Sequence, residues 1–172
     1  MRTHPTLRCV VALSIVFGTS FLTAQTSIKL EESVITENRE LDRLLIEAHD
    51  QKNTEKVLSV FSEGANTFFI APNGVLNKGR DAIRKSYSEF FAGLDSLHGE
   101  IKDVSYVPAG EGVIAVGTVI FYRHPKNAPA DQRTVIWTDY RRRENGRWVY
   151  IFRHAHWPLA SNPQLNPAPP RK

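Results

Sequence analysis

The stretch from Arg133 to Pro158, RTVIWTDYRRRENGRWVYIFRHAHWP, decides the fold of this 172-residue chain. Two runs rich in β-branched and aromatic residues flank the dipeptide Asn145-Gly146. Asn-Gly best tolerates the two positive φ angles of a type I′ turn. With these residues in the turn, Glu144 pairs with Arg147, and the stretch predicts a long β-hairpin.

Both faces of this hairpin are largely apolar. An uninterrupted ladder places Trp137 opposite His154 and Asp139 opposite Phe152. One face then carries Val135, Trp137, Asp139, Arg141, Trp148, Tyr150, Phe152, His154 and His156. The opposite face carries an apolar set that includes Ile136, Tyr140, Val149, Ile151 and Trp157. In a monomer that second face would stay exposed, so we expect a homodimer formed through the sheet.

The composition is that of one ordinary globular domain. Hydrophobic residues make up 41% of the chain and charged residues 23%, and the formal net charge is +4. The basic residues form no stripe with interleaved aromatics, so we expect no nucleic-acid partner.

Residues 1–24 have the layout of a secretory signal peptide. Arg2 and Arg8 form a basic start, Cys9 to Phe17 is a short apolar run, and Ala24 is a small residue at a cleavage point. We therefore expect export to the periplasm or the extracellular space, without stable membrane insertion after cleavage. A retained N-terminal anchor is the alternative. Cleavage would remove the single cysteine, which excludes a disulfide framework.

Residues 25–157 are interpreted as one domain and the proline-rich residues 158–172 as a disordered tail. Apolar spacing predicts two helices, a short hairpin, a third helix and then four consecutive antiparallel strands. Their expected ranges are 28–53, 53–64, 66–76, 79–93, 101–107, 113–124, 133–143 and 147–157. This order predicts an α+β fold, in which three N-terminal helices pack on one face of a curved antiparallel sheet and form a cone-shaped barrel. Such a cone commonly encloses a ligand pocket.

Several of these stretches resemble the SnoaL-like branch of the nuclear transport factor 2-like superfamily. The resemblance spans about residues 35–157 and rests on Ala48–Asn53, Phe68–Gly74, Lys78–Ile83, Trp137–Arg142, Gly146–Trp148 and His154. Similar members often end in Trp-x-Ile-x-His-x-His-x-Ser, whereas this chain has Phe152 in place of the first histidine and His156 in place of the serine. The family contains cyclases, isomerases, epoxide hydrolases and a kinase association domain, so the fold alone predicts function poorly.

His154 and Asp139 are the expected catalytic pair. As diagonal neighbours on one face they could share a hydrogen bond that makes His154 a general base. The alternative is structural: Asp139 forms an ion pair with Arg141 or Arg153, and His154 stacks on Trp137.

The other predicted ligand-pocket residues are Trp137, Arg141, Tyr150, Phe152, His156, Tyr87 and Tyr122. Tyr87 and Tyr122 are either oxyanion donors or core tyrosines. His154 and His156 have the spacing of a metal-binding pair, with His124 or Asp139 as a third ligand, but two histidines are a weak signal, and we expect neither metal nor cofactor. His49 and His98 are interpreted as surface residues. An Asp–Arg–Asp constellation of the epoxide-hydrolase type would have to combine Asp139 and Arg141 with Asp103.

Two functional hypotheses remain. The first is an exported protein that binds a small, mostly apolar molecule in a conical pocket and, if it is an enzyme, performs cofactor-free isomerisation, cyclisation or hydration. The second is a non-catalytic association module that works through its exposed sheet face.

Overall fold

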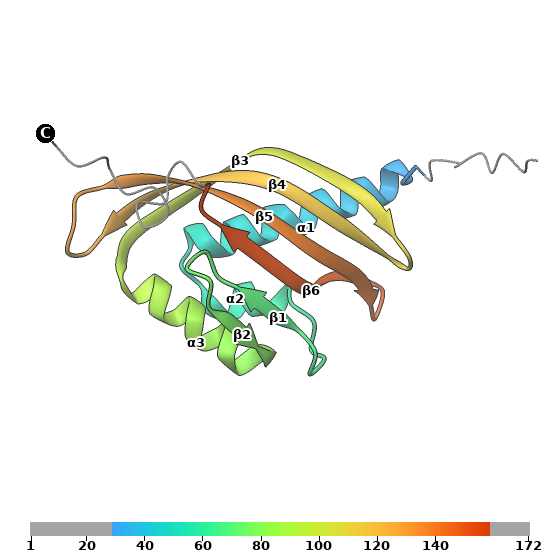
Figure 1. Ribbon diagram of the computed structural model, residues 1–172, viewed down its shortest axis with the longest axis horizontal. Coiled ribbons are helices and arrows are strands. Elements are labelled where there is room, and N and C mark those ends of the chain that lie inside the picture. The colour runs from blue at the N-terminus through green and yellow to red at the C-terminus, as the bar shows by residue number, and fades with distance from the viewer. Residues whose placement is uncertain (1–28, 159–172) are drawn as a thin grey trace, which may run out of the picture.

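The computed structural model describes residues 29–158, which fold into a six-stranded sheet that arches over three helices (Figure 1). The elements are α1 (Glu32–Asp50), α2 (Thr54–Ser59), β1 (Phe68–Ile70), β2 (Leu76–Lys78), α3 (Gly79–Ala92), β3 (Leu94–Ala109), β4 (Gly112–Pro125), β5 (Asp131–Glu144) and β6 (Arg147–His156). The α+β fold is confirmed. The expected signal, residues 1–24, and all of the expected tail except Pro158 lie outside the described residues. Among the described helices, none combines the length and the apolar character that a membrane span requires.

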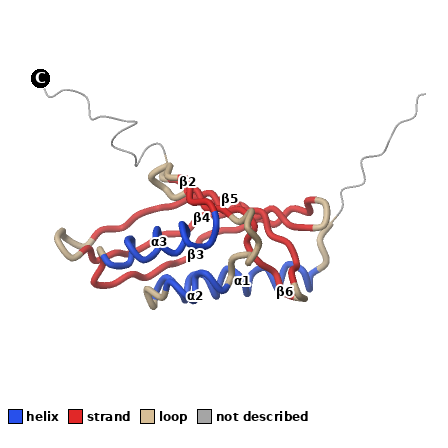
Figure 2. Tube along the Cα trace, turned by 90° about the horizontal axis from the view of Figure 1, so that it is seen from below, coloured by secondary structure: helices blue, strands red, loops and turns tan. Residues whose placement is uncertain are grey.

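The sheet has the strand order β2-β1-β6-β5-β4-β3. Neighbouring strands are antiparallel except β1 and β6, which run parallel because the chain passes through α3 and the rest of the sheet between them. The sheet curls without closing, and Figure 2 views the molecule from the side that the helices cover. Its concave face and the helices therefore form the walls of a cone.

The helices bury the stripes that their apolar spacing predicts. Leu41, Leu45 and Ala48 of α1 and Ile83 and Phe91 of α3 are all buried. These stripes face the concave side of the sheet, where they complete the core.

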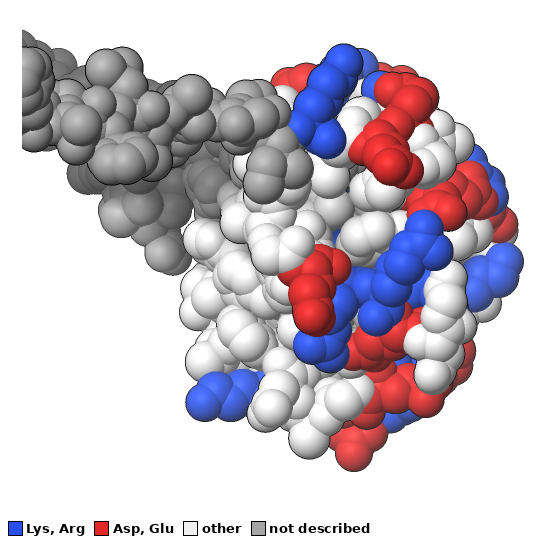
Figure 3. Space-filling view, turned by 90° about the vertical axis from the view of Figure 1, so that its right-hand side faces the viewer, with Lys and Arg blue, Asp and Glu red and all other residues white. Residues whose placement is uncertain are grey.

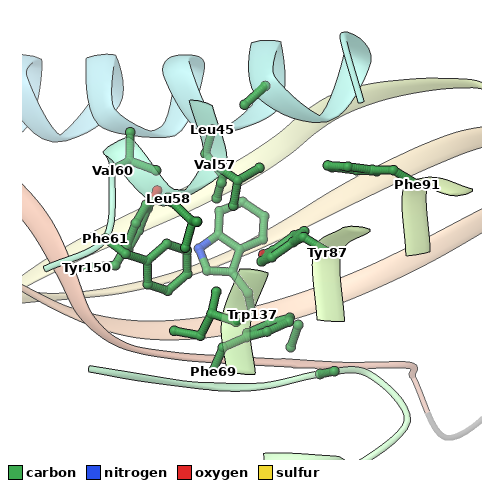
Figure 4. Close-up of a cluster of buried hydrophobic side chains, with 14 of the residues drawn as sticks. Leu45, Val57, Leu58, Val60, Phe61, Phe69, Tyr87, Phe91, Trp137 and Tyr150 are labelled. Atoms are coloured by element: carbon green, nitrogen blue, oxygen red, sulfur yellow. The ribbon is translucent and has the colours of Figure 1, made fainter. Parts of the chain in front are cut away.

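Trp137 of β5 lies at the centre of this core, among side chains from the helices and the sheet (Figure 4). It is 1% exposed. The neighbouring strand makes room for the indole with Gly117, because a Cβ at that position would lie 2.5 Å from the Trp137 ring and 2.7 Å from the carbonyl oxygen of Asp103.

The turn of the central hairpin is the predicted one. Asn145 and Gly146 have φ angles of 51° and 79°, and Glu144 pairs with Arg147. The pairing is regular as far as Arg141 and Tyr150.

Beyond that point the predicted register is wrong, because β6 contains a β-bulge. Tyr140 pairs with Phe152 whereas Arg141 pairs with Tyr150, so Ile151 is an extra residue on β6. Asp139 consequently lies opposite Arg153 rather than Phe152.

The bulge exchanges the two faces of β6 from Phe152 onward. Phe152, His154 and His156 move to the convex face, while Arg153 and Ala155 turn towards the helices and are buried. The predicted exposed patch changes as well, because Val149 is buried and Trp157 packs against the core.

The end of the molecule where α1 begins carries charges of both signs. Lys and Arg side chains alternate there with Asp and Glu side chains, so this surface has no field of a single sign (Figure 3). Further along α1, Arg43 pairs with both Glu40 and Glu47.

Candidate functional site

A cavity of about 460 Å³ lies between the end of α1, α3, the β1–β2 hairpin and the concave face of the sheet. Most of its wall is apolar or aromatic, from Phe69, Phe90, Val119, Phe121, Val135, Ala155 and Trp157. Exposed lining residues such as Val75 and Lys85 mark the mouth. The buried polar groups of the wall are His49, Asn77, Tyr87 and Arg153.

His49 reaches the cavity from the last turn of α1. Its ring stacks on Phe121 at a centroid distance of 5.2 Å and meets the edges of Tyr87 and Phe91. Its Nδ1 donates to the carbonyl oxygen of Leu45 at 2.7 Å, so the Nε2 atom keeps its lone pair.

Burial lowers the pKa of His49 from 6.5 to about 4, because the charged imidazolium would lose its hydration there. The positive charge of Arg153 acts in the same direction. His49 is therefore a neutral imidazole at pH 7, with a lone pair on Nε2. The interpretation of His49 as a surface residue was wrong, since it is only 6% exposed.

Tyr87 of α3 stacks on Phe69 at 5.1 Å, and its hydroxyl end points towards Trp137 (Figure 4). Burial raises the pKa of Tyr87 to about 12, although the nearby charge of Arg153 lowers it somewhat. The hydroxyl thus stays protonated and can donate a hydrogen bond. Tyr87 is the one predicted ligand-pocket residue that borders the described cavity, and its role as a donor stays a prediction.

Arg153 enters the cavity wall from β6. Its guanidinium carbon lies 5.3 Å from the ring centre of Trp137 and 5.2 Å from that of Tyr150. Its Nη1 donates to Asp139 at 2.7 Å. The two rings and the carboxylate hold the charged group in one position.

Behind Arg153 lies a buried charge cluster, formed by Asp42, Asp139, Arg141 and Arg153. Arg141 donates to Asp139 at 2.6 and 3.2 Å and to Asp42 at 2.6 and 3.2 Å. Asp42 also accepts hydrogen bonds from the hydroxyls of Tyr106 and Tyr150, at 2.7 and 3.0 Å. Desolvation raises the pKa of Asp139, and the two arginines oppose this effect.

The cluster contains an Asp–Arg–Asp arrangement, but its second carboxylate is Asp42 of α1 and not Asp103. Arg141 and the Asp139 side chain are 0% exposed, and neither borders the cavity. This arrangement therefore cannot touch a molecule in the cavity as an epoxide-hydrolase-type site requires.

The predicted hydrogen bond between His154 and Asp139 is contradicted. The bulge at Ile151 places the two residues on opposite faces of the sheet, with His154 opposite Thr138. Asp139 instead forms ion pairs with both Arg141 and Arg153. This agrees with the alternative hypothesis, in which Asp139 has a structural role.

His154 does not stack on Trp137 either, because its ring lies 5.4 Å from that of His156 on the convex face. Burial lowers the pKa of His154, and His156 adds to the effect. Within residues 29–158, no group of three His, Cys, Asp or Glu side chains is arranged to hold a metal ion.

The remaining predicted pocket residues lie away from the cavity. Trp137, Arg141 and Tyr150 are concave-side residues buried behind its wall. Phe152, His156 and Tyr122 lie on the convex face.

The sequence interpretation missed His49 and Arg153. His49 follows Leu41 and Leu45 at helical spacing, so its place on the buried stripe of α1 could have been read from the sequence. Arg153 faces the cavity only because of the bulge.

Comparison with known proteins places the fold. The sequence profile of the SnoaL-like domain matches residues 43–151, and no curated protein matches the sequence significantly. Similar solved structures include an NTF2-like superfamily protein from Salmonella enterica, with a TM-score of 0.69 and 16% identity over 76% of this chain and 94% of that one.

Two further structures carry names of enzymes. One, provisionally named a dehydratase of the NTF2-like family, from Streptomyces avermitilis, has a TM-score of 0.67 and 18% identity over 74% of this chain and 97% of that one. The other is the hexachlorocyclohexane dehydrochlorinase LinA type 2, with a TM-score of 0.65 and 9% identity over 73% and 85% of the two chains. At these identities the likeness concerns the fold, and the profile match identifies the family. The chain belongs to the SnoaL-like domain family.

Proposed function

We propose that this protein binds a small, mostly apolar molecule in the cavity and catalyses a cofactor-free proton transfer on it. The observation that carries the proposal is the state of His49. Its Nδ1–H is fixed by Leu45, its ring is neutral, and the residue lines a cavity with apolar walls. A neutral imidazole in such a place can act as a general base.

The chemistry follows from the neighbours of His49. A C–H or O–H group of the ligand would give its proton to Nε2, and the resulting imidazolium would return the proton to another atom of the same molecule. The Tyr87 hydroxyl would donate to the oxygen on which negative charge develops. Isomerisation, cyclisation and hydration all need these two roles.

Hydrogen–deuterium exchange of a carbon acid in D₂O tests this function. With 2-tetralone as probe, the wild-type protein should accelerate loss of the ¹H NMR signals beside the carbonyl. His49→Gln should slow exchange by about a hundredfold or more, the usual contribution of a general base. His124→Gln, on an exposed site outside the cavity, is the matched control. Equal exchange with wild type and His49→Gln would refute the role of His49.

The proposal also includes export and a homodimer. Export is supported by the signal-like residues 1–24, and N-terminal sequencing of the protein recovered outside the cytoplasm would test it. The dimer is supported by the exposed apolar side chains of the convex face, among them Val107, Ile114, Val116 and Tyr122.

A further inference from the structure

The guanidinium of Arg153 has N–H donors that form no hydrogen bond within the described residues. A guanidinium carries five N–H groups, and among residues 29–158 the structure gives Arg153 a single hydrogen bond, to Asp139. The residue is 6% exposed and borders the cavity. A buried cation whose N–H donors are unpaired at a cavity wall can bind a ligand that carries a hydrogen-bond acceptor.

The charges behind Arg153 alternate in sign. Asp42, Arg141, Asp139 and Arg153 form a chain joined by ion pairs, and its positive end lies at the cavity. Asp139 is held mainly by two hydrogen bonds from Arg141. Arg153 therefore borders the cavity, whereas the carboxylates of Asp139 and Asp42 lie behind it.

The other groups of the wall feel this positive charge. Arg153 lowers the pKa of both His49 and Tyr87. The other two cationic lining residues are already paired, Arg123 through two hydrogen bonds with the half-buried Asp131 and Lys85 with the exposed Glu89. Arg153 is thus the cation that a molecule deep in the cavity would meet.

Resting on the proposed function, we infer that the ligand is a small aromatic carboxylate, whose carboxylate binds Arg153 and whose ring packs between the aromatic walls. The carboxylate would extend the alternating chain by one negative charge. A guanidinium fork suits a carboxylate because both groups are planar and can share two parallel hydrogen bonds. Phe69, Phe90, Phe121 and Trp157 supply the apolar surface for the ring.

The test compares two probes of nearly equal shape, 2-naphthoate and 2-naphthamide, by isothermal titration calorimetry at pH 7. The wild-type protein should bind the carboxylate roughly tenfold or more tightly, the usual effect of a buried charged hydrogen bond. Arg153→Gln should remove this preference and retain binding of 2-naphthamide. Arg133→Gln, at an ion pair with Asp131 outside the cavity lining, should leave the preference intact.

A second measurement needs no substitution. In ¹⁵N-labelled wild-type protein, 2-naphthoate should raise the pKa of His49 from about 4, because a bound anion offsets the charge of Arg153, whereas 2-naphthamide should not. This result stays decisive even if Arg153→Gln fails to fold.

The outcomes separate the two proposals. Equal affinity for the two probes, or a preference that survives in Arg153→Gln, would overturn the carboxylate inference and leave the binding function standing. No binding of either probe would overturn both. Carboxylate binding without His49-dependent exchange of 2-tetralone would keep this inference and refute the catalytic role.

Discussion

The buried state of His49 predicts a specific loss of stability in mild acid. The fold holds the pKa of this imidazole near 4, whereas in the unfolded chain it returns to about 6.5. As the pH falls through 6.5, the unfolded state therefore takes up a proton that the folded state refuses. Stability contributed by the neutral ring is complete above pH 6.5 and is lost as the pH falls towards 4.

The magnitude follows from the two values. Complete loss below pH 4 corresponds to about 3 kcal/mol, and about 2 kcal/mol of it is lost between pH 7 and pH 5. In that window few carboxylates titrate, so the effect should stand out.

Urea unfolding followed by tryptophan fluorescence at pH 7, 6 and 5 measures this loss. His49→Phe keeps an aromatic ring against Phe121 but cannot be protonated, so its free energy of unfolding should fall less by about 2 kcal/mol over the same range. His124→Gln should behave as wild type. His154 is present in all three proteins, and its own contribution cancels in the comparison. Parallel pH profiles for wild type and His49→Phe would refute the buried neutral state of His49.

Three further substitutions test the fold around the site. Gly117→Ala places a Cβ 2.5 Å from the fully buried Trp137 ring, and should lower the free energy of unfolding by about 1–3 kcal/mol in urea titrations; an unchanged midpoint would contradict the close packing. Asp42→Ala removes one partner of the buried Arg141 and should cost about 3–5 kcal/mol, measured in the same way; a loss below about 1 kcal/mol would show that the cluster is not sealed. Val116→Lys, on the exposed convex face, should convert the proposed dimer into a monomer in light scattering without changing the circular dichroism spectrum; a wild-type protein that is already monomeric would exclude the dimer.

The sequence determines local features of the fold well, because each depends on neighbouring residues. The amphipathic stripes of α1 and α3 and the Asn145-Gly146 turn are examples. The pairing of Glu144 with Arg147 follows from that turn. These features were predicted because propensity, apolar spacing and turn chemistry agree.

The register beyond the turn was not predictable in the same way. Val149, Tyr150, Ile151 and Phe152 are all aliphatic or aromatic, so no charged residue marks the point at which alternation breaks. A bulge within such a run leaves no trace in the pattern, yet it reverses every later side chain. One unpaired residue, Ile151, thus separates the predicted site from the observed cavity.

The long-range ion pairs could not be predicted from the sequence, for a different reason. Arg141 joins Asp42 across 99 positions of the chain, and nothing local to either residue indicates the other. Asp103 was the strand carboxylate that the sequence offered as the second aspartate of the Asp–Arg–Asp arrangement. It is exposed in β3, next to a register shift between Ile101 and Asp103.

The buried charge cluster also explains why a cation lies at the wall of the cavity. Replacing a buried ion pair by well-packed apolar residues is often neutral or stabilising, so folding stability alone is a weak reason for four charges in this core. What the cluster does that apolar residues could not do is hold a cation at the cavity wall, with Arg141 fixing Asp139 and Asp139 fixing Arg153.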